Sequence, residues 1–338
     1  MKKAISILSS IILLAGCYPD YVQDYDEGAG VFTAYQYDLR TFVIGENESF
    51  DFTVALGGVI NNTKDRAVKV VVDNSLLTSD LSVIAPSDST ASFTAYEGML
   101  GSAPFGVVSQ KYVTEEVRNS GIKALTELPE SYYTVSGLDG LTIKSGRHTA
   151  VATIKATEFV KEDPNMFAPY YALGFKIISA EDADIDPKMS FEVIAVKCEN
   201  LLFGDWGYGG TTSVQDMSGN ELYSTSNEFS YADDKSYTLT TKSANSLLTN
   251  KIEASAGKLL LTLNDDNTIK VECADGSRVI EPITGEDSYF NGAKKLEERE
   301  IYLNYKYSAG GMVYVVHDVL KFRGRNRDGV REYQGINE

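Results

Sequence analysis

The sequence predicts an all-β protein of two domains, a β-sandwich followed by an antiparallel meander that can close into a small barrel. Two observations support this prediction. Short runs of alternating apolar and polar residues recur along the chain, and turn signals rich in Gly, Asn and Asp separate them. At 43% hydrophobic and 23% charged residues, the composition is that of a folded globular protein rather than a disordered chain.

The first half contains the alternating runs that we expect to form the sandwich. They lie at 50–56, 68–72, 132–135, 141–143, 149–155, 170–178 and 190–197. Residues 82–127 interrupt the pattern with Gly, Pro, Ser and aromatic residues over a length that no simple hairpin connection needs. We expect an irregular embellishment on one end of the sandwich there, and a ligand-contacting loop is the alternative.

The second half begins after a glycine-dense stretch at 199–210, which also holds the only tryptophan, Trp206. From residue 231 we expect strands to resume as consecutive hairpins. One hairpin pairs 258–263 with 268–273 across an Asn-Asp-Asp-Asn turn, and another pairs 301–307 with 312–320. These boundaries predict a sandwich domain at 31–200 and a barrel or meander at 201–338.

The N-terminus has the pattern of a secretory signal. Lys2 and Lys3 precede an apolar run at 4–15, which is too short to cross a bilayer and has the size of a signal-peptide core. The run ends in Leu14-Ala-Gly-Cys17, which resembles the bacterial lipobox. The resemblance implies that residues 1–16 are removed and that Cys17 carries the lipid, with an ordinary secreted protein as the alternative.

Residues 17–30 predict a solvated tether, because Pro19 and several carboxylates leave little apolar surface to bury. Acidic residues so soon after the cysteine resemble the surface-export signal of Bacteroidetes lipoproteins. We therefore expect the protein at the outer membrane, exposed on the cell surface. No second apolar stretch is long enough to span a membrane, so the lipid is the only anchor expected.

The charge excludes some partners. Removing residues 1–16 removes Lys2 and Lys3, which takes the formal net charge from -17 to -19. Such a charge repels nucleic acid and anionic headgroups but does not disfavour neutral ligands. Against this background, a basic group lies near the C-terminus and predicts a solvated tail, with an anionic sugar or a transporter as alternative partners: Lys321, Arg323, Arg325, Arg327 and Arg331.

No catalytic constellation stands out. His148 and His317 are the only histidines, no Gly-x-Ser-x-Gly motif occurs, and no clustered His and Cys residues have the spacing of a zinc site. We expect no metal, no cofactor and no enzymatic activity, although paired carboxylates of a glycosidase need no sequence signature. Cys198 and Cys273 each end an alternating run, and we expect two buried thiols rather than a disulfide.

Aromatic side chains are the better candidates for binding, because the apolar faces of sugar rings pack on exposed aromatic rings. Trp206 and Tyr208 lie in the glycine-rich stretch, and Tyr302 and Tyr314 lie in the last hairpin. These four residues are the predicted ligand-binding residues. The alternative is that each of them is packed for structural reasons.

The chain also resembles a known group of proteins. Leu128-Pro-Glu-Ser-Tyr-Tyr-Thr-Val135 and Ala150-Val-Ala-Thr-Ile154 look like the N-terminal immunoglobulin-like domain of many Bacteroidetes surface lipoproteins. Asp205-Trp-Gly207, Leu263-Asn-Asp-Asp-Asn-Thr-Ile269 and Leu303-Asn-Tyr-Lys-Tyr307 resemble the calycin-like domain often joined to it. The resemblance implies an immunoglobulin-like sandwich followed by a calycin-like antiparallel barrel or meander.

Such proteins are similar in role to the SusE- and SusF-type accessory lipoproteins of polysaccharide utilisation. The resemblance therefore implies non-enzymatic capture of a polysaccharide or oligosaccharide at the cell surface, beside an outer-membrane transporter complex. Two other functions stay open. One is a structural or assembly lipoprotein, fimbrial or transporter-docking, without sugar affinity. The other is a glycoside hydrolase with unrecognised carboxylates.

Overall fold

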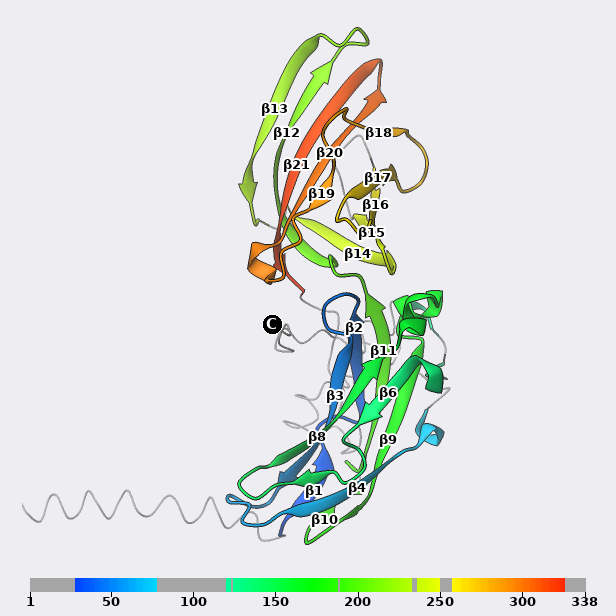
Figure 1. Ribbon diagram of the computed structural model, residues 1–338, viewed down its shortest axis with the longest axis vertical. Coiled ribbons are helices and arrows are strands. Elements are labelled where there is room, and N and C mark those ends of the chain that lie inside the picture. The colour runs from blue at the N-terminus through cyan, green and yellow to red at the C-terminus, as the bar shows by residue number, and fades with distance from the viewer. Residues whose placement is uncertain are drawn as a thin grey trace, which may run out of the picture.

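The protein is described by a computed structural model that covers residues 28–77, 120–122, 124–187, 189–232, 236–249 and 257–325. The predicted signal peptide, Cys17, most of the tether and most of the 82–127 segment lie outside the described residues. Two β-domains follow one another along the long axis of the molecule, with the sandwich at one end and the barrel at the other (Figure 1). The prediction of an all-β protein is confirmed.

The N-terminal part is a sandwich of two curled mixed sheets. The five-stranded sheet has the order β10 (Asp184–Ile185), β1 (Gly30–Thr33), β3 (Ser49–Gly57), β8 (Thr149–Ala156) and β6 (Tyr133–Ser136). The facing sheet has the order β2 (Tyr37–Val43), β11 (Phe191–Glu199), β9 (Tyr171–Ala180), β4 (Arg66–Val72) and β7 (Thr142–Ile143), and β5 (Thr126–Glu127) pairs with β9. Most neighbours are antiparallel, but β1–β10, β2–β11 and β5–β9 are parallel pairs.

The core of the sandwich follows from strand periodicity, since successive side chains point to opposite faces of a sheet. In β3, Phe50, Phe52, Val54 and Leu56 alternate with more exposed residues and are all buried. Phe52 stacks on Phe175 from the opposite sheet with ring centroids 4.6 Å apart. The alternating run that predicted this strand is therefore the run that fills the space between the sheets.

The C-terminal part is a nearly closed antiparallel barrel. Its strands lie in the order β17 (Ile269–Cys273), β16 (Leu259–Leu263), β15 (Ser246–Thr249), β14 (Tyr237–Ser243), β12 (Gly204–Gln215), β21 (Met312–Gly324), β20 (Glu300–Ala309) and β18 (Ile280–Pro282). Two further strands flank this path: β13 (Glu221–Ser230) pairs with β12, and β19 (Tyr289–Phe290) pairs with β20. Both predicted hairpins, β16–β17 and β20–β21, are confirmed.

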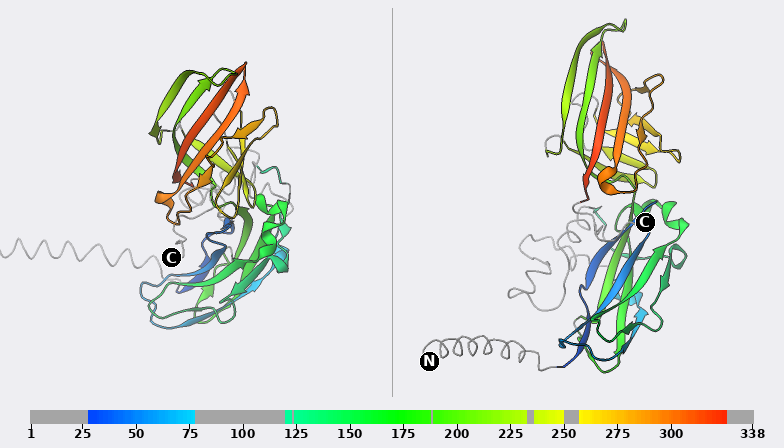
Figure 2. Two further views of the ribbon diagram at one scale, coloured as in Figure 1. Left: turned by 45° about the horizontal axis from the view of Figure 1, so that its top comes forward. Right: turned by 60° about the vertical axis from the view of Figure 1, so that its left-hand side comes forward.

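One sequence-based expectation was wrong. The stretch 199–210 was expected to be a junction with strands resuming at residue 231, but β12 begins at Gly204 and β13 occupies 221–230. Gly, Asn and Asp are depleted in strands, so these segments carry little β-propensity of their own. Pairing with β21 stabilises β12 instead, because the two strands are hydrogen-bonded along nearly the whole length of β12. The β12–β13 and β20–β21 hairpins extend away from the sandwich (Figure 2).

Candidate ligand-binding surface

Strand β12 alternates aromatic residues with glycines, and the two sets face opposite sides of the barrel wall. Trp206 and Tyr208 are buried on the inner face. Gly207 and Gly209 occupy the intervening outer positions. The glycine-rich motif is thus a strand with large side chains inside and none outside.

Trp206 lies at the end of the barrel nearest the sandwich and has no exposed surface. Its indole Nε1 donates a hydrogen bond to the carbonyl oxygen of Leu202 at 3.0 Å, and its ring meets Phe322 edge to face. A buried Trp that satisfies its N–H in this way closes the barrel end as a packing residue. In this arrangement its ring faces are covered by protein.

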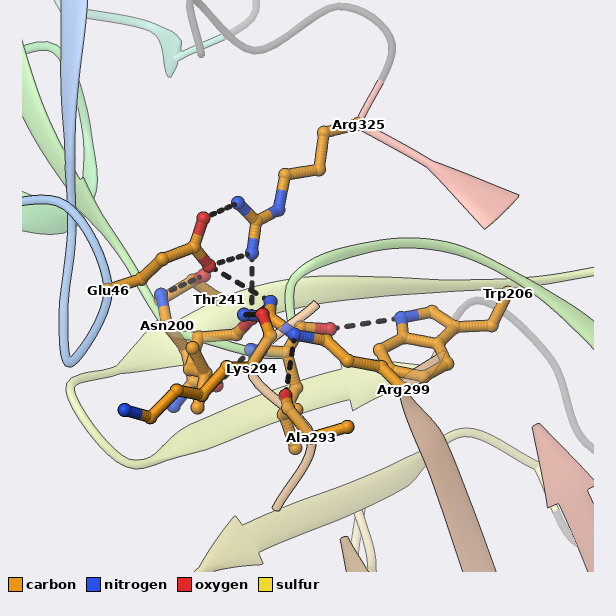
Figure 3. A network of polar contacts seen from close by, with 10 residues as sticks. Glu46, Asn200, Trp206, Thr241, Ala293, Lys294, Arg299 and Arg325 are labelled. Atoms are coloured by element: carbon orange, nitrogen blue, oxygen red, sulfur yellow. Dashed lines mark hydrogen bonds and ion pairs between the residues drawn. The ribbon is translucent and has the colours of Figure 1, made fainter. Parts of the chain in front are cut away.

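Next to Trp206, a polar network joins the two domains (Figure 3). Glu46, in the turn between β2 and β3, accepts both guanidinium nitrogens of Arg325, at 2.9 and 2.8 Å, and one of Arg299 at 2.9 Å. Both arginines also donate to the carbonyl oxygen of Leu201. The expectation of a solvated C-terminal basic tail is therefore wrong for Arg325, whose side chain is buried at the junction.

The charges of this network shift one another's ionisation. Burial raises the pKa of Glu46, but the hydrogen bonds and charges of Arg325 and Arg299 lower it by more, so the pKa lies below its ordinary value. Burial lowers the pKa of Arg299, although Glu46 opposes this effect. Glu46 therefore stays ionised near neutral pH, and the network binds the domains to each other rather than a ligand.

Tyr208 belongs to a polar layer in the barrel interior. Its ring lies 5.0 Å from that of Tyr237, and its hydroxyl accepts a hydrogen bond from Asn227 of β13 at 3.3 Å. Tyr305 and Asp318 are buried in the same interior. Burial and then the charge of Asp318 raise the pKa of Tyr305 well above its ordinary value. Tyr305 therefore stays protonated, and the layer lies inside the barrel wall.

Tyr314 also faces inward, at the end of the barrel far from the sandwich. It stacks on Tyr307, its partner across the β20–β21 hairpin, with centroids 4.9 Å apart and planes only 2° from parallel. Arg278 also lies over the ring of Tyr307, with its guanidinium carbon 5.7 Å from the ring centroid. The structure therefore does not bring Tyr314 together with Tyr302, which faces the opposite side of the sheet.

Tyr302 is the one predicted residue on the outer face. It stacks on Tyr289 of β19, with centroids 4.7 Å apart and planes 13° from parallel. Tyr289 is 40% exposed, so the pair presents flat apolar surface to solvent. The Tyr302 hydroxyl donates to Glu300, and this hydrogen bond raises the pKa of Tyr302 to about 12.

Glu300 links the tyrosine pair to the neighbouring strand. Its second carboxylate oxygen lies 2.6 Å from the ammonium of Lys321 on β21. The hydrogen bonds from Lys321 and then from Tyr302 hold the pKa of Glu300 below its ordinary value. Lys321 in turn lies over the ring of Phe229, with its nitrogen 5.4 Å from the centroid. The acid and the base are thus an ion pair on the open face of the barrel.

A second aromatic pair follows on the far side of Lys321. Phe229 and Tyr231 meet edge to face with centroids 4.8 Å apart, and they are 38% and 48% exposed. Their rings lie over the bare backbone of β12. A Cβ at Gly207 would come within 2.6 Å of the Tyr231 ring and 2.8 Å of the Phe229 ring, whereas one at Gly209 would come within 2.8 Å of the Phe229 backbone. Glycine at 207 is therefore what lets both rings lie against the strand, and glycine at 209 lets the backbone of β13 approach β12.

These contacts form one continuous row across the outer face of β19, β20, β21, β12 and β13, which we call the outer strip. It consists of Tyr289, Tyr302, Glu300, Lys321, Phe229 and Tyr231. Exposed rings that flank a few polar groups are the chemistry that packs on the faces of sugar rings and hydrogen-bonds their hydroxyls. Of these six residues, Tyr302 was predicted from the sequence as a binding residue and Lys321 only as part of the C-terminal basic group, whereas the other four were not predicted.

Signals for a metal or a nucleophile are sparse in the part of the chain that is described. Within it, no three His, Cys, Asp or Glu side chains gather where a metal ion could bind. Cys198 and Cys273 are both free thiols, as expected, but only Cys198 is fully buried. His148 contacts the carbonyl oxygen of Val59, and His317 contacts Asn304 and Glu286. No described helix is both long and apolar enough to cross a bilayer.

Comparisons with known proteins agree with the fold. A family model that describes an N-terminal domain matches residues 25–184. No curated protein matches the chain. A solved protein of unknown function from Bacteroides ovatus has a similar structure, with a TM-score of 0.59 at 18% identity, over 88% of this chain and 96% of that one. An auxiliary nutrient binding protein from Bacteroides thetaiotaomicron gives a TM-score of 0.40 at 12% identity, over 84% of this chain and 90% of that one.

Proposed function

We propose that the protein is a non-enzymatic lipoprotein of the outer membrane that captures glycan at the cell surface through the outer strip. The lipobox at Cys17 and the acidic tether support the anchor and the location. The net charge of -17 favours a neutral ligand over nucleic acid or an anionic surface.

The observation that supports glycan binding most directly is the Tyr289–Tyr302 stack. Two parallel rings are held rigid on neighbouring strands, partly exposed, beside a carboxylate that can accept hydrogen bonds from hydroxyl groups. A preorganised aromatic surface costs little conformational entropy when it binds a ligand. Surface rings that served packing alone would gain nothing from remaining open to solvent.

Affinity gel electrophoresis of the mature protein in xylan, glucomannan, laminarin and starch tests this function. We expect retardation in at least one gel, and a loss of at least about tenfold in affinity when Tyr289 and Tyr302 are both changed to Ala. Tyr223→Ala is the control, because Tyr223 is an exposed tyrosine of the same domain outside the outer strip. Failure of all four polysaccharides to retard the wild type would refute glycan capture.

A docking function is the second candidate, and one feature favours it. The tip of the β12–β13 hairpin, away from the sandwich, carries three strongly exposed apolar residues, Met217, Leu222 and Tyr223. Exposed apolar groups that cluster at one point are typical of protein contacts. Under this function, Tyr223→Ala reduces recovery of an outer-membrane transporter in pull-down, whereas the change of Tyr289 and Tyr302 to Ala does not.

A further inference from the structure

The outer strip contains two aromatic platforms rather than one. The Tyr289–Tyr302 stack lies on β19 and β20, and the Phe229–Tyr231 pair belongs to β13 and the residue that follows it. From β20, the path to β13 crosses β21 and β12. The rings of the second pair lie over Gly207 of β12, two strands from β20, so with strands about 4.8 Å apart the two platforms are separated by about 10 Å. That distance exceeds what one sugar ring can span.

The register of the sheet places both platforms on the same face, one row apart along the strands. Tyr302 pairs with Val319, and Val319 pairs with Gly209, whose outer side lies against the backbone of Phe229 rather than its ring. One row along, Glu300 pairs with Lys321, and Lys321 pairs with Gly207 beneath Tyr231. A ligand that contacts both platforms therefore crosses the strands rather than following one of them.

The middle of this path is polar but carries no net charge. Glu300 and Lys321 neutralise one another at 2.6 Å, and Lys321 is held above the Phe229 ring as well. The carboxylate can accept and the ammonium can donate hydrogen bonds to hydroxyl groups of a ligand. An anionic ligand gains little from a lysine that is already paired, in a protein whose net charge is -17.

We infer that the outer strip binds an extended, uncharged polysaccharide chain laid across the strands, with one stretch of the chain on each platform. This inference rests on the proposed function and adds the length and charge of the ligand. A short oligosaccharide occupies one platform only. A longer one occupies both, and the second contact is then intramolecular, which multiplies affinity without changing either platform.

Isothermal titration with a disaccharide and an octasaccharide, both prepared from a polysaccharide that retards the wild type, tests the inference. In a double variant with Ala at both Phe229 and Tyr231, we expect octasaccharide binding to weaken by about tenfold and disaccharide binding to stay nearly unchanged. Because the two rings cover Gly207, a variant with Leu at both positions keeps the apolar cover and is expected to show the same selective loss. Tyr223→Ala should change neither affinity. Polygalacturonate, the charged probe, should not retard the protein.

The outcomes separate the inference from the function it rests on. If no polysaccharide retards the wild type, the proposal of glycan capture itself is refuted. Alternatively, a polysaccharide retards the wild type while the Phe229 and Tyr231 variants lose affinity for both oligosaccharides equally, or for neither. In that case the protein binds glycan, but the outer strip is not a two-platform site. Strong retardation of the protein in a polygalacturonate gel would overturn the inferred preference for an uncharged chain.

Discussion

Glu46 and Arg325 form a two-point ion pair that joins the sandwich to the barrel, with Oε1–Nη1 at 2.9 Å and Oε2–Nη2 at 2.8 Å. Two parallel hydrogen bonds between a carboxylate and a guanidinium fix orientation as well as distance. Arg325 also stacks on Phe203, with its guanidinium carbon 4.4 Å from the ring centroid. The last described residue of the barrel thus anchors a turn near the start of the sandwich.

Changing Glu46 to Ala should be strongly destabilising, because it leaves the guanidinium groups of Arg299 and Arg325 buried without their shared carboxylate. Removing one partner of a buried ion pair costs about 3–5 kcal/mol. We expect the free energy of unfolding in urea to fall by that amount, and the transitions of the two domains to separate.

Glu158→Ala is the control for this loss, since Glu158 pairs with Lys161 while 84% of its side chain is exposed. An exposed pair of this kind contributes about 1 kcal/mol or less. A Glu46 variant as stable as the Glu158 variant would show that the junction does not depend on the network.

The contribution of Glu46 should depend on pH in a definite direction. Its pKa in the folded protein lies below the ordinary value of 4.5, because the two arginines outweigh the effect of burial. A depressed pKa stabilises the fold above the unfolded-state pKa, and the stabilisation disappears as pH falls through the folded-state pKa. The difference in unfolding free energy between wild type and Glu46→Gln should therefore be constant near neutrality and shrink below about pH 4.5. A difference that grew in acid would contradict this assignment.

Much of the fold could be predicted because the buried strands carry a strong apolar alternation. The β3 pattern and the β20–β21 hairpin are visible in the residues themselves, since each buries one face and turns at Gly or Asn. The β12–β13 pair could not be predicted in this way. The outer face of β12 is glycine at 207 and 209, and β13 is almost entirely exposed, so the pair lacks the strong apolar alternation of the buried strands.

The candidate site was predicted only in part for the same reason. Tyr302 was found because it alternates with the buried Ile301 and Leu303. Phe229 and Tyr231 gave no signal in sequence, because what makes them a surface pair is the absence of a side chain on Gly207 across the sheet. Cross-strand neighbours of this kind depend on register, which a single sequence does not reveal.

Gly207→Ala should therefore disrupt the outer strip although none of the strip's own residues is replaced. The new Cβ would lie 2.6 Å from the Tyr231 ring and 2.8 Å from Phe229, so both rings must move. Overpacking of this kind costs about 1–3 kcal/mol, and octasaccharide affinity should fall as well. Gly30→Ala, where a Cβ has nothing within 4 Å, should change neither quantity. An unchanged octasaccharide affinity in a folded Gly207 variant would show that the ring positions do not matter.

Cys17→Ala tests the anchor independently of binding. Cys17 lies outside the described residues, and the prediction rests on the lipobox and on the lack of any other long apolar segment. The variant should lose palmitate labelling and leave the membrane fraction, while its purified form binds glycan as the wild type does. Retention of label and membrane association together would overturn the predicted lipidation.

Trp206 offers a test that separates the junction from the outer strip, because it is the only tryptophan in the chain. It is fully buried beside the Glu46 network and faces the barrel interior, whereas the strip lies on the other side of the wall. Its fluorescence should shift to longer wavelength on unfolding but should not change when a glycan saturates the protein. Trp206→Phe should lose the hydrogen bond to Leu202 and some packing, at a cost of about 1–3 kcal/mol, and keep its glycan affinity. Quenching by glycan in the wild type, together with lost binding in this variant, would move the site from the outer strip to the barrel end that Trp206 closes.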